Sequence, residues 1–169
     1  MITSQRISVA LVAILLSSFG CGLSETPERT PVVTETLSQC EDTENLLERI
    51  ECYAALATDE DDPSVCGRSS HEGVKYQCFA VLAERRGSKE LCDEIPSRSP
   101  DHKKLRDVCI SDVAAQTLSP LLCEEIQTVG LRDSCYVKIG QQTKDTTLCQ
   151  RIQDPGLRSI CTGQPVMVE

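Results

Sequence analysis

The cysteines are the residues of this chain whose number and spacing are informative about chemistry. The sequence contains 11 cysteines in 169 residues, far above average usage. Cysteines bind metals, exchange disulfides or form structural cross-links. Zinc sites and redox pairs usually place two cysteines about two to four residues apart. No two cysteines here are closer than 12 residues, so the spacing favours structural disulfides.

Ten of the cysteines outline a repeat of about 26 residues. They alternate between a leading and a trailing position, 12 residues apart in four units and 17 residues apart in the third, and 14 residues separate each trailing cysteine from the next leading one. The five additional residues of the third unit fall within IPSRSPDHKK, residues 95–104, whose prolines and charges predict a surface loop. The pairs of units one to five are Cys40 and Cys52, Cys66 and Cys78, Cys92 and Cys109, Cys123 and Cys135, and Cys149 and Cys161.

Each unit is predicted to form a short helix, a turn and a longer helix. Four residues before every leading cysteine stands a side chain that commonly caps helix N-termini, and in units two and four a proline follows at the first helical position. Apolar residues four positions before and after the trailing cysteine, such as Leu131 and Ile139 around Cys135, would share one helical face. The five predicted N-cap residues are Thr36, Asp62, Ser88, Ser119 and Asp145.

The positions of the turns predict which cysteines pair. In the fifth unit, Cys149 lies five residues before Asp154 and Cys161 lies five residues after Gly156, so the two face each other in a hairpin. Pairing Cys135 with Cys149 across the preceding turn would offset them by about 7 Å along the helices, at the limit of the Cα separation that a disulfide allows. We therefore expect pairing within each unit.

These expectations define an all-α fold, in which five disulfide-stapled helical hairpins stack as a short α-solenoid over residues 36–162. A single hairpin of this size cannot bury its own apolar face, so neighbouring copies must cover it. The layout is similar to the disulfide-clipped, tetratricopeptide-like repeats of some secreted bacterial proteins, whose units are longer than about 30 residues. That resemblance implies an architecture and carries over no functional residue.

The N-terminus has the features of an export signal. Arg6 precedes an uncharged, mostly apolar run from Ile7 to Gly20, which predicts a signal peptide over residues 1–20. Gly20 directly before Cys21, with GLSETPERTPVVTET after it, resembles the processing site and tether of bacterial lipoprotein precursors. The resemblance implies lipidation at Cys21 and a flexible tether over residues 21–35, and it accounts for the odd eleventh cysteine. Plain secretion and a retained membrane anchor are the alternatives.

The charged residues point away from several functions. The formal net charge of −9 would repel phosphate backbones, so we expect no nucleic-acid partner. The acidic run TDEDDP, residues 58–63, lacks the glycine turn and distal glutamate of a calcium loop and is interpreted as a solvated turn. His71 and His102 lie in no catalytic motif and are expected in loops. We therefore expect no metal, no cofactor and no catalytic residue.

A basic residue stands three positions before each trailing cysteine. Such cations more often pair with neighbouring carboxylates, as Asp107 and Asp133 would allow, and we expect that pairing. The alternative is that Arg106, Arg132 and Arg158 form a stripe that binds an anionic partner.

Together these features predict an exported, lipid-anchored protein of the bacterial cell envelope that acts as a non-enzymatic binding or scaffold module. Its partner would be an envelope or extracellular protein, with the lipid holding it to a membrane, and residues 163–169 would form a C-terminal tail. The alternative functions are a secreted enzyme inhibitor that seats residues 95–104 in a protease, and an enzyme with no recognisable motif.

Overall fold

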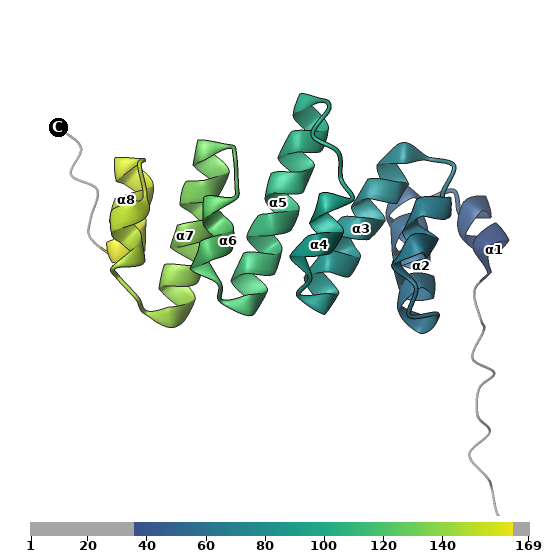
Figure 1. Cartoon of the computed structure of the whole chain (residues 1–169), viewed down its shortest axis with the longest axis horizontal. Helices are drawn as coiled ribbons and strands as arrows, with labels where there is room; N and C mark the ends of the chain where they lie inside the picture. The colour runs from purple at the N-terminus through teal and green to yellow at the C-terminus, as the bar shows by residue number, and fades with distance from the viewer. Residues whose placement is uncertain (1–35, 164–169) are drawn as a thin grey trace, which may run out of the picture. The chain divides into compact units, whose positions relative to one another are not determined.

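The computed structural model describes residues 36–163, so the predicted signal peptide, Cys21, the tether and the tail after Gly163 lie outside the described residues. Within this range every regular element is a helix (Figure 1). Each unit holds one short and one long helix, as predicted. The short helices are α1 (Leu37–Asp42), η1 (Pro63–Arg68), α4 (Lys89–Asp93), α6 (Pro120–Glu124) and η2 (Leu148–Arg151), and the long helices are α2 (Leu46–Asp59), α3 (Glu72–Arg86), α5 (Pro100–Thr117), α7 (Val129–Thr143) and α8 (Pro155–Thr162).

The short helices begin where their N-cap residues predict, with one exception. Thr36, Asp62, Ser88 and Ser119 occupy the N-cap positions of α1, η1, α4 and α6. In the fifth unit the N-cap is Thr147. Asp145 still accepts the Thr147 amide at 2.9 Å, so it closes the turn that precedes η2 and does not cap the helix itself.

The five additional residues of the third unit do not all form a loop. Measured from the leading cysteine, α5 begins two positions later than the other long helices, and its first turn adds the remaining three residues. Ser99 Oγ accepts the His102 amide at 3.2 Å, and Pro100 stands at the first helical position, where it needs no hydrogen-bond partner. The expected surface loop over residues 95–104 is therefore wrong for its second half, which is helical and carries His102.

Each hairpin is closed by one disulfide between its leading and trailing cysteine, as the spacing predicted. The Cα atoms of the bridged pairs lie 5.4–5.8 Å apart. Nine of the ten bridged cysteines are buried, and Cys52 alone is partly exposed. The bridges thus form part of the core, beside buried isoleucines that stand three residues after the leading cysteine in the last three units, namely Ile95, Ile126 and Ile152.

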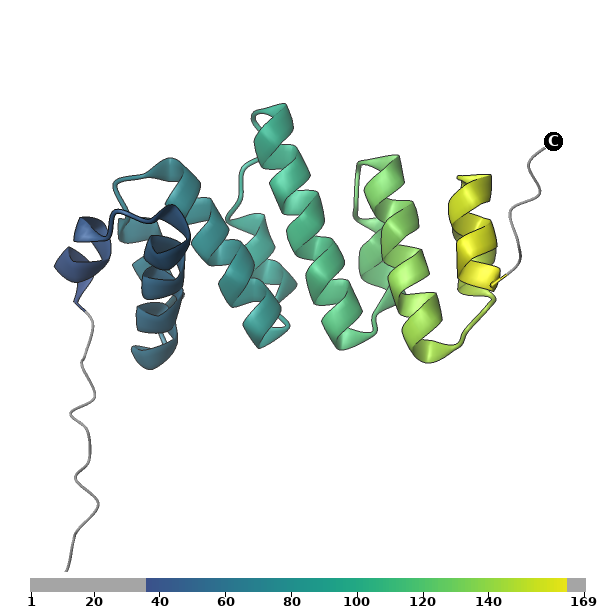
Figure 2. The ribbon, with the colours of Figure 1, turned by 180° about the vertical axis from the view of Figure 1, so that it is seen from behind.

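The units contact one another in chain order. Each long helix packs against the next, from α2 to α3, α5, α7 and α8. Each of η1, α4, α6 and η2 contacts its own long helix and the long helix of the preceding unit. In Figure 1, α4 and α6 lie in front of the long helices, and in Figure 2 they lie behind them.

Buried carboxylates tie successive units together. Asp107 of α5 accepts the Gln127 and Thr128 amides of the next unit, one on each carboxylate oxygen, at 3.1 and 2.8 Å. Asp133 of α7 accepts the Gln153 and Asp154 amides on a single oxygen, at 3.0 and 2.8 Å. Both side chains are at most 1% exposed. They bind backbone amides and form no ion pair with another residue of 36–163, so Asp107 and Asp133 are not the carboxylate partners expected for the basic residues.

The junction between units two and three uses an aromatic contact in place of a carboxylate. Tyr76 occupies the position of Asp107 and Asp133, two residues before the trailing cysteine. Its ring meets the His102 ring edge-on, with centroids 4.9 Å apart. The altered start of α5 brings His102 to this position, so the expectation that this histidine lies in a solvated loop is wrong.

The carboxylate clamps predict different costs for two similar substitutions. Asp107→Asn places an amide NH₂ against a backbone N–H, because both oxygens of Asp107 accept hydrogen bonds. We expect a loss of about 2 kcal/mol in the free energy of unfolding, measured by urea denaturation. Asp133→Asn should cost less, since one oxygen accepts both amides. Asp101→Asn, at an exposed first-turn position of α5, is the control and should cost only about 0.3 kcal/mol, the contribution of an exposed carboxylate near a helix N-terminus. Equal losses for Asp107→Asn and Asp101→Asn would contradict the clamp.

The exposure of the bridges predicts the order of their reduction. The Cys40–Cys52 bridge should open first under limiting reductant, because Cys52 is the partly exposed cysteine and exchange requires access to sulfur. Alkylation followed by peptide mass mapping measures this order.

Each bridge stabilises its hairpin by about 3 kcal/mol, so complete reduction should abolish the helical circular dichroism at 37 °C. Retention of the helical signal, or earlier opening of Cys92–Cys109, would be inconsistent with these roles.

Candidate functional site

The predicted basic stripe lies on three successive long helices, but the guanidinium groups of Arg106 and Arg158 make contacts within their own units. Arg158 donates from Nε and Nη2 to the Ile152 carbonyl at 3.0 and 2.6 Å, and Arg49 makes the same pair of bonds to Thr43. Arg106 pairs with Asp93 at 2.5 Å. Arg132 is half-buried on α7. Arg106 and Arg158 therefore brace the short helix of their hairpin, and their donors already have partners.

The remaining candidate residues, His71 and Asp62 of the acidic run 58–63, lie at the starts of helices. His71 is an exposed residue at the N-cap position of α3. In the acidic run, Asp62 accepts the Ser64 amide at 2.9 Å and an Arg68 nitrogen at 3.0 Å, so it caps η1. Across residues 36–163 there is no group of three or more metal-binding side chains that could hold an ion.

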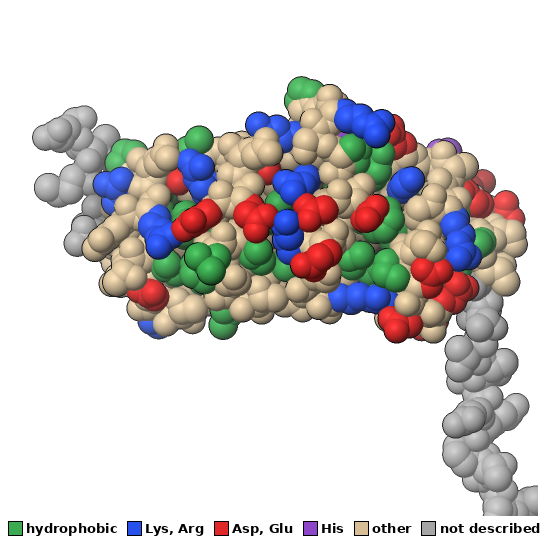
Figure 3. All heavy atoms as spheres, in the orientation of Figure 1, with side chains coloured by type: hydrophobic (Ala, Val, Ile, Leu, Met, Phe, Trp, Pro, Cys, Tyr) green, Lys and Arg blue, Asp and Glu red, His purple; other side chains and the backbone are tan. Residues whose placement is uncertain are grey.

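The face formed by the short helices carries an ion-pair network between units three and four. Lys89 Nζ lies 2.9 Å from Asp93 Oδ2 and 3.0 Å from Glu125 Oε2, and Asp93 Oδ1 lies 2.5 Å from Arg106. The order is carboxylate, ammonium, carboxylate, guanidinium. Figure 3 shows acidic and basic side chains alternating across this face, with hydrophobic side chains beside them. The network joins α4 to α6 and to α5.

The protonation of this network follows from its contacts. Burial would raise the pKa of Asp93, but the hydrogen bonds from Lys89 and Arg106 outweigh it and hold that pKa below its ordinary value. The hydrogen bonds to Asp93 and Glu125 raise the pKa of Lys89. Asp93 and Lys89 are thus both charged at neutral pH, and their ion pairs close the face at this junction.

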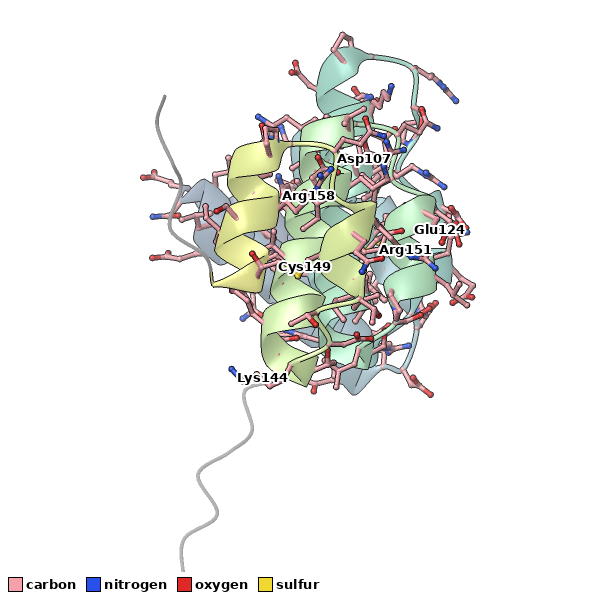
Figure 4. All side chains as sticks on the ribbon, turned by 90° about the vertical axis from the view of Figure 1, so that its left-hand side faces the viewer. Asp107, Glu124, Lys144, Cys149, Arg151 and Arg158 are labelled. Atoms are coloured by element: carbon pink, nitrogen blue, oxygen red, sulfur yellow. A yellow bond between two sulfur atoms is a disulfide. The ribbon has the colours of Figure 1, made fainter. Side chains whose placement is uncertain are left out.

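The junction between units four and five is closed in a related way. Arg151 of η2 pairs with Glu124 of α6, and its guanidinium lies 5.9 Å from the centre of the Tyr136 ring. Figure 4 shows Arg151 and Glu124 directed toward one another from neighbouring short helices.

The junction between units two and three is open instead. A groove of about 300 Å³ lies between η1, α3 and α4, lined by Pro63, Ser64, Gly67, Lys75, Phe79, Leu91 and Glu94. Its apolar part is formed by Phe79, Leu91 and Pro63. Lys75 and Glu94 bring one ammonium and one carboxylate, and neither makes an ion pair within residues 36–163. A hollow with an apolar floor and unpaired polar groups at its edge is the form that ligand sites take.

Two residue types open this groove. Gly67 stands directly after the leading cysteine, and a Cβ placed there would meet no atom within 4 Å. The same position holds an acidic residue in units one, three and four. Pro63 stands where unit three has Lys89. The glycine that opens the groove can be recognised in the sequence. When the five units are aligned at their leading cysteines, the next position holds one glycine among acidic and polar residues: Glu41, Gly67, Asp93, Glu124 and Gln150.

Comparisons with known proteins leave the function to be argued from these residues. No protein-family model, no curated protein and no solved structure matches the chain. Among the described residues, no helix has the length and apolar character needed to cross a bilayer. The five disulfides are consistent with an exported or extracellular protein, because such bonds persist in oxidising compartments.

The network around Asp93 predicts a pH-dependent contribution to stability. Because its folded-state pKa is lowered, the stabilisation is fully present above the ordinary aspartate pKa of about 3.9 and is lost as the pH falls through the folded-state pKa. Asp93→Asn should therefore lower the free energy of unfolding by about 0.5–1 kcal/mol at pH 7, a value reduced by solvent screening. The difference from the natural chain should shrink as the pH falls through the lowered folded-state pKa of Asp93. A difference that does not change with pH would contradict the ionic network. Lys138→Gln, which breaks the isolated Lys138–Asp112 pair, serves as the control for an exposed ion pair and should cost less.

Proposed function

We propose that this chain is an exported protein of the bacterial cell envelope, anchored by a lipid at Cys21, whose helical-repeat body is a non-enzymatic binding module. The five buried disulfides support export. The signal-like run before Cys21 and the single cysteine left outside the bridged pairs support lipidation at that residue.

The body is proposed to be a short α-solenoid. The recurrent packing of each long helix on the next, and of each later short helix between two long ones, supports this architecture. In a solenoid each unit contacts its neighbours only, and the lateral faces form an extended surface for partners.

The two terminal units are interpreted as caps. In units two to five the residue before the leading cysteine is Val65, Leu91, Leu122 or Leu148, whereas unit one has the exposed Gln39. At the other end, Thr162 is exposed at the position that holds Tyr53, Phe79, Ile110 and Tyr136, all of them buried, in the earlier units. Polar end faces prevent further stacking, so we assign binding to a lateral face and not to end-to-end assembly.

The observation that carries the assignment is the groove at Gly67. On the short-helix face, the junctions after units three and four are closed by ion pairs. The junction after unit two instead has a hollow with an unpaired ammonium and an unpaired carboxylate. Two opposite charges without an intramolecular partner, set beside an apolar floor, can both be paired by one ligand that carries both charges. We therefore place the binding site of the module on this face.

The intact mass of the protein purified from a bacterial envelope tests the proposal. The unreduced protein should lack residues 1–20, carry acyl chains on Cys21 and take up no alkylating agent. A photo-crosslinking residue at Leu121, which is 69% exposed on α6, should give a discrete adduct in the envelope. The same residue at Gln142, which is exposed on a surface lined by long-helix residues alone, should not.

Two controls separate the parts of this proposal. Cys21→Ser should release the folded chain from the membrane fraction, since no lipid can then be attached. An unacylated mass, or membrane retention of the Cys21→Ser chain, would refute the lipid anchor. Equal cross-linking at both positions would refute the choice of face, and alkylation of the unreduced chain would refute the bridged body.

A further inference from the structure

The groove at Gly67 lacks two groups that the corresponding junction after unit three contains. There, the charges run Glu125, Lys89, Asp93, Arg106, with contacts of 3.0, 2.9 and 2.5 Å. The corresponding residues after unit two are Glu94, Pro63, Gly67 and Lys75. The outer carboxylate and the outer cation are present, but the inner ammonium and the inner carboxylate are missing.

The missing pair defines the chemistry of a ligand. The ammonium and carboxylate at the centre of the closed network are 2.9 Å apart. The ammonium nitrogen and nearer carboxylate oxygen of a free α-amino acid are about 2.7 Å apart by standard bond lengths. A zwitterionic amino acid can therefore take the place of both inner side chains at once. Its carboxylate would meet Lys75, as Asp93 meets Arg106, and its ammonium would meet Glu94, as Lys89 meets Glu125.

We infer that the groove binds a free α-amino acid with an apolar side chain, with the carboxylate on Lys75 and the ammonium on Glu94. The ligand side chain lies on Phe79, Leu91 and Pro63. This inference rests on the proposed binding function of the short-helix face and names the ligand class that it takes. Phe79 is buried and Leu91 half-buried, so the floor is set by the core and is present before the ligand arrives.

The size of the groove favours a single amino acid over a protein segment. Its volume of about 300 Å³ is at the lower end for small-molecule sites, whereas a docked helix with side chains is about 10 Å wide. Glu94 is exposed and Lys75 half-buried. Ion pairs of this kind are weak, so the dissociation constant is expected to be on the order of 1 mM.

A nuclear magnetic resonance titration of the disulfide-bonded chain with leucine tests the inference. The backbone amides of Gly67 and Leu91 should shift saturably up to about 20 mM ligand. N-acetyl-leucine lacks the ammonium and leucinamide lacks the carboxylate. Each should bind about 2- to 5-fold more weakly than leucine, because one of the two ion pairs is lost.

Matched glycine variants show whether the ligand occupies the open position. Gly67→Asp supplies within the chain the carboxylate that Asp93 supplies in unit three, and it has room to do so. It should abolish leucine binding without lowering the melting temperature. Gly73→Asp makes the same change in charge at another open glycine, outside the groove, and should bind like the natural chain. Lys75→Gln should weaken leucine binding while leaving the weak binding of leucinamide unchanged.

Each outcome decides the inference. Saturable shifts that Gly67→Asp removes and Gly73→Asp retains would support it. Shifts that are not saturable, that are equal for leucine and its two derivatives, or that survive Gly67→Asp would overturn it. Binding of a peptide with adjacent Lys and Glu side chains, without binding of leucine, would also overturn it and indicate a protein ligand. The lipid anchor and the cross-linking face are measured independently, so failure here leaves the proposed function standing.

Discussion

A helical hairpin of about 26 residues buries too little apolar surface to hold its two helices together, and this limit governs the whole body. The chain has few aromatic side chains to compensate. Each hairpin is instead closed by a disulfide whose sulfur atoms lie largely within the core. The cross-link removes conformational freedom from the unfolded chain. Short helices of four to six residues, which are unstable alone, can then pack as fixed elements.

The cross-links act within units, so the contacts between units need their own device. Buried Asp107 and Asp133 provide it by accepting backbone amides of the following loop. A buried carboxylate that accepts two backbone amides holds the next hairpin by charge-assisted, directional hydrogen bonds, which constrain its angle and register. Where the third unit departs from the regular spacing, Tyr76 and His102 replace this clamp. The irregular unit therefore changes the chemistry of its junction as well as its length.

The same logic applies on the short-helix face, where the junctions differ in charge. Two are closed by ion pairs, and the one at Gly67 is open over an apolar floor. Because the units share one backbone plan, a closed junction shows which groups the open one lacks. In a repeat protein a ligand site can thus arise by removing two side chains, without adding any catalytic or metal-binding residue.

The sequence by itself determined the units, their helical character and the cysteine pairing, because these depend on local spacing: caps before each leading cysteine, and equal distances from each turn. The sequence also shows that Gly67 replaces an acidic or polar residue at the position after the leading cysteine. Tertiary structure alone decided the roles of the charged residues. Asp107 and Arg106 are adjacent in the chain, yet one is buried against the next unit and the other pairs with Asp93. Helical geometry turns neighbouring side chains about 100° apart, so the partner of each depends on which unit packs beside that face. The groove at Gly67 likewise follows from packing between units, which no local pattern specifies, whereas the start of α5 has local signals in Ser99 and Pro100.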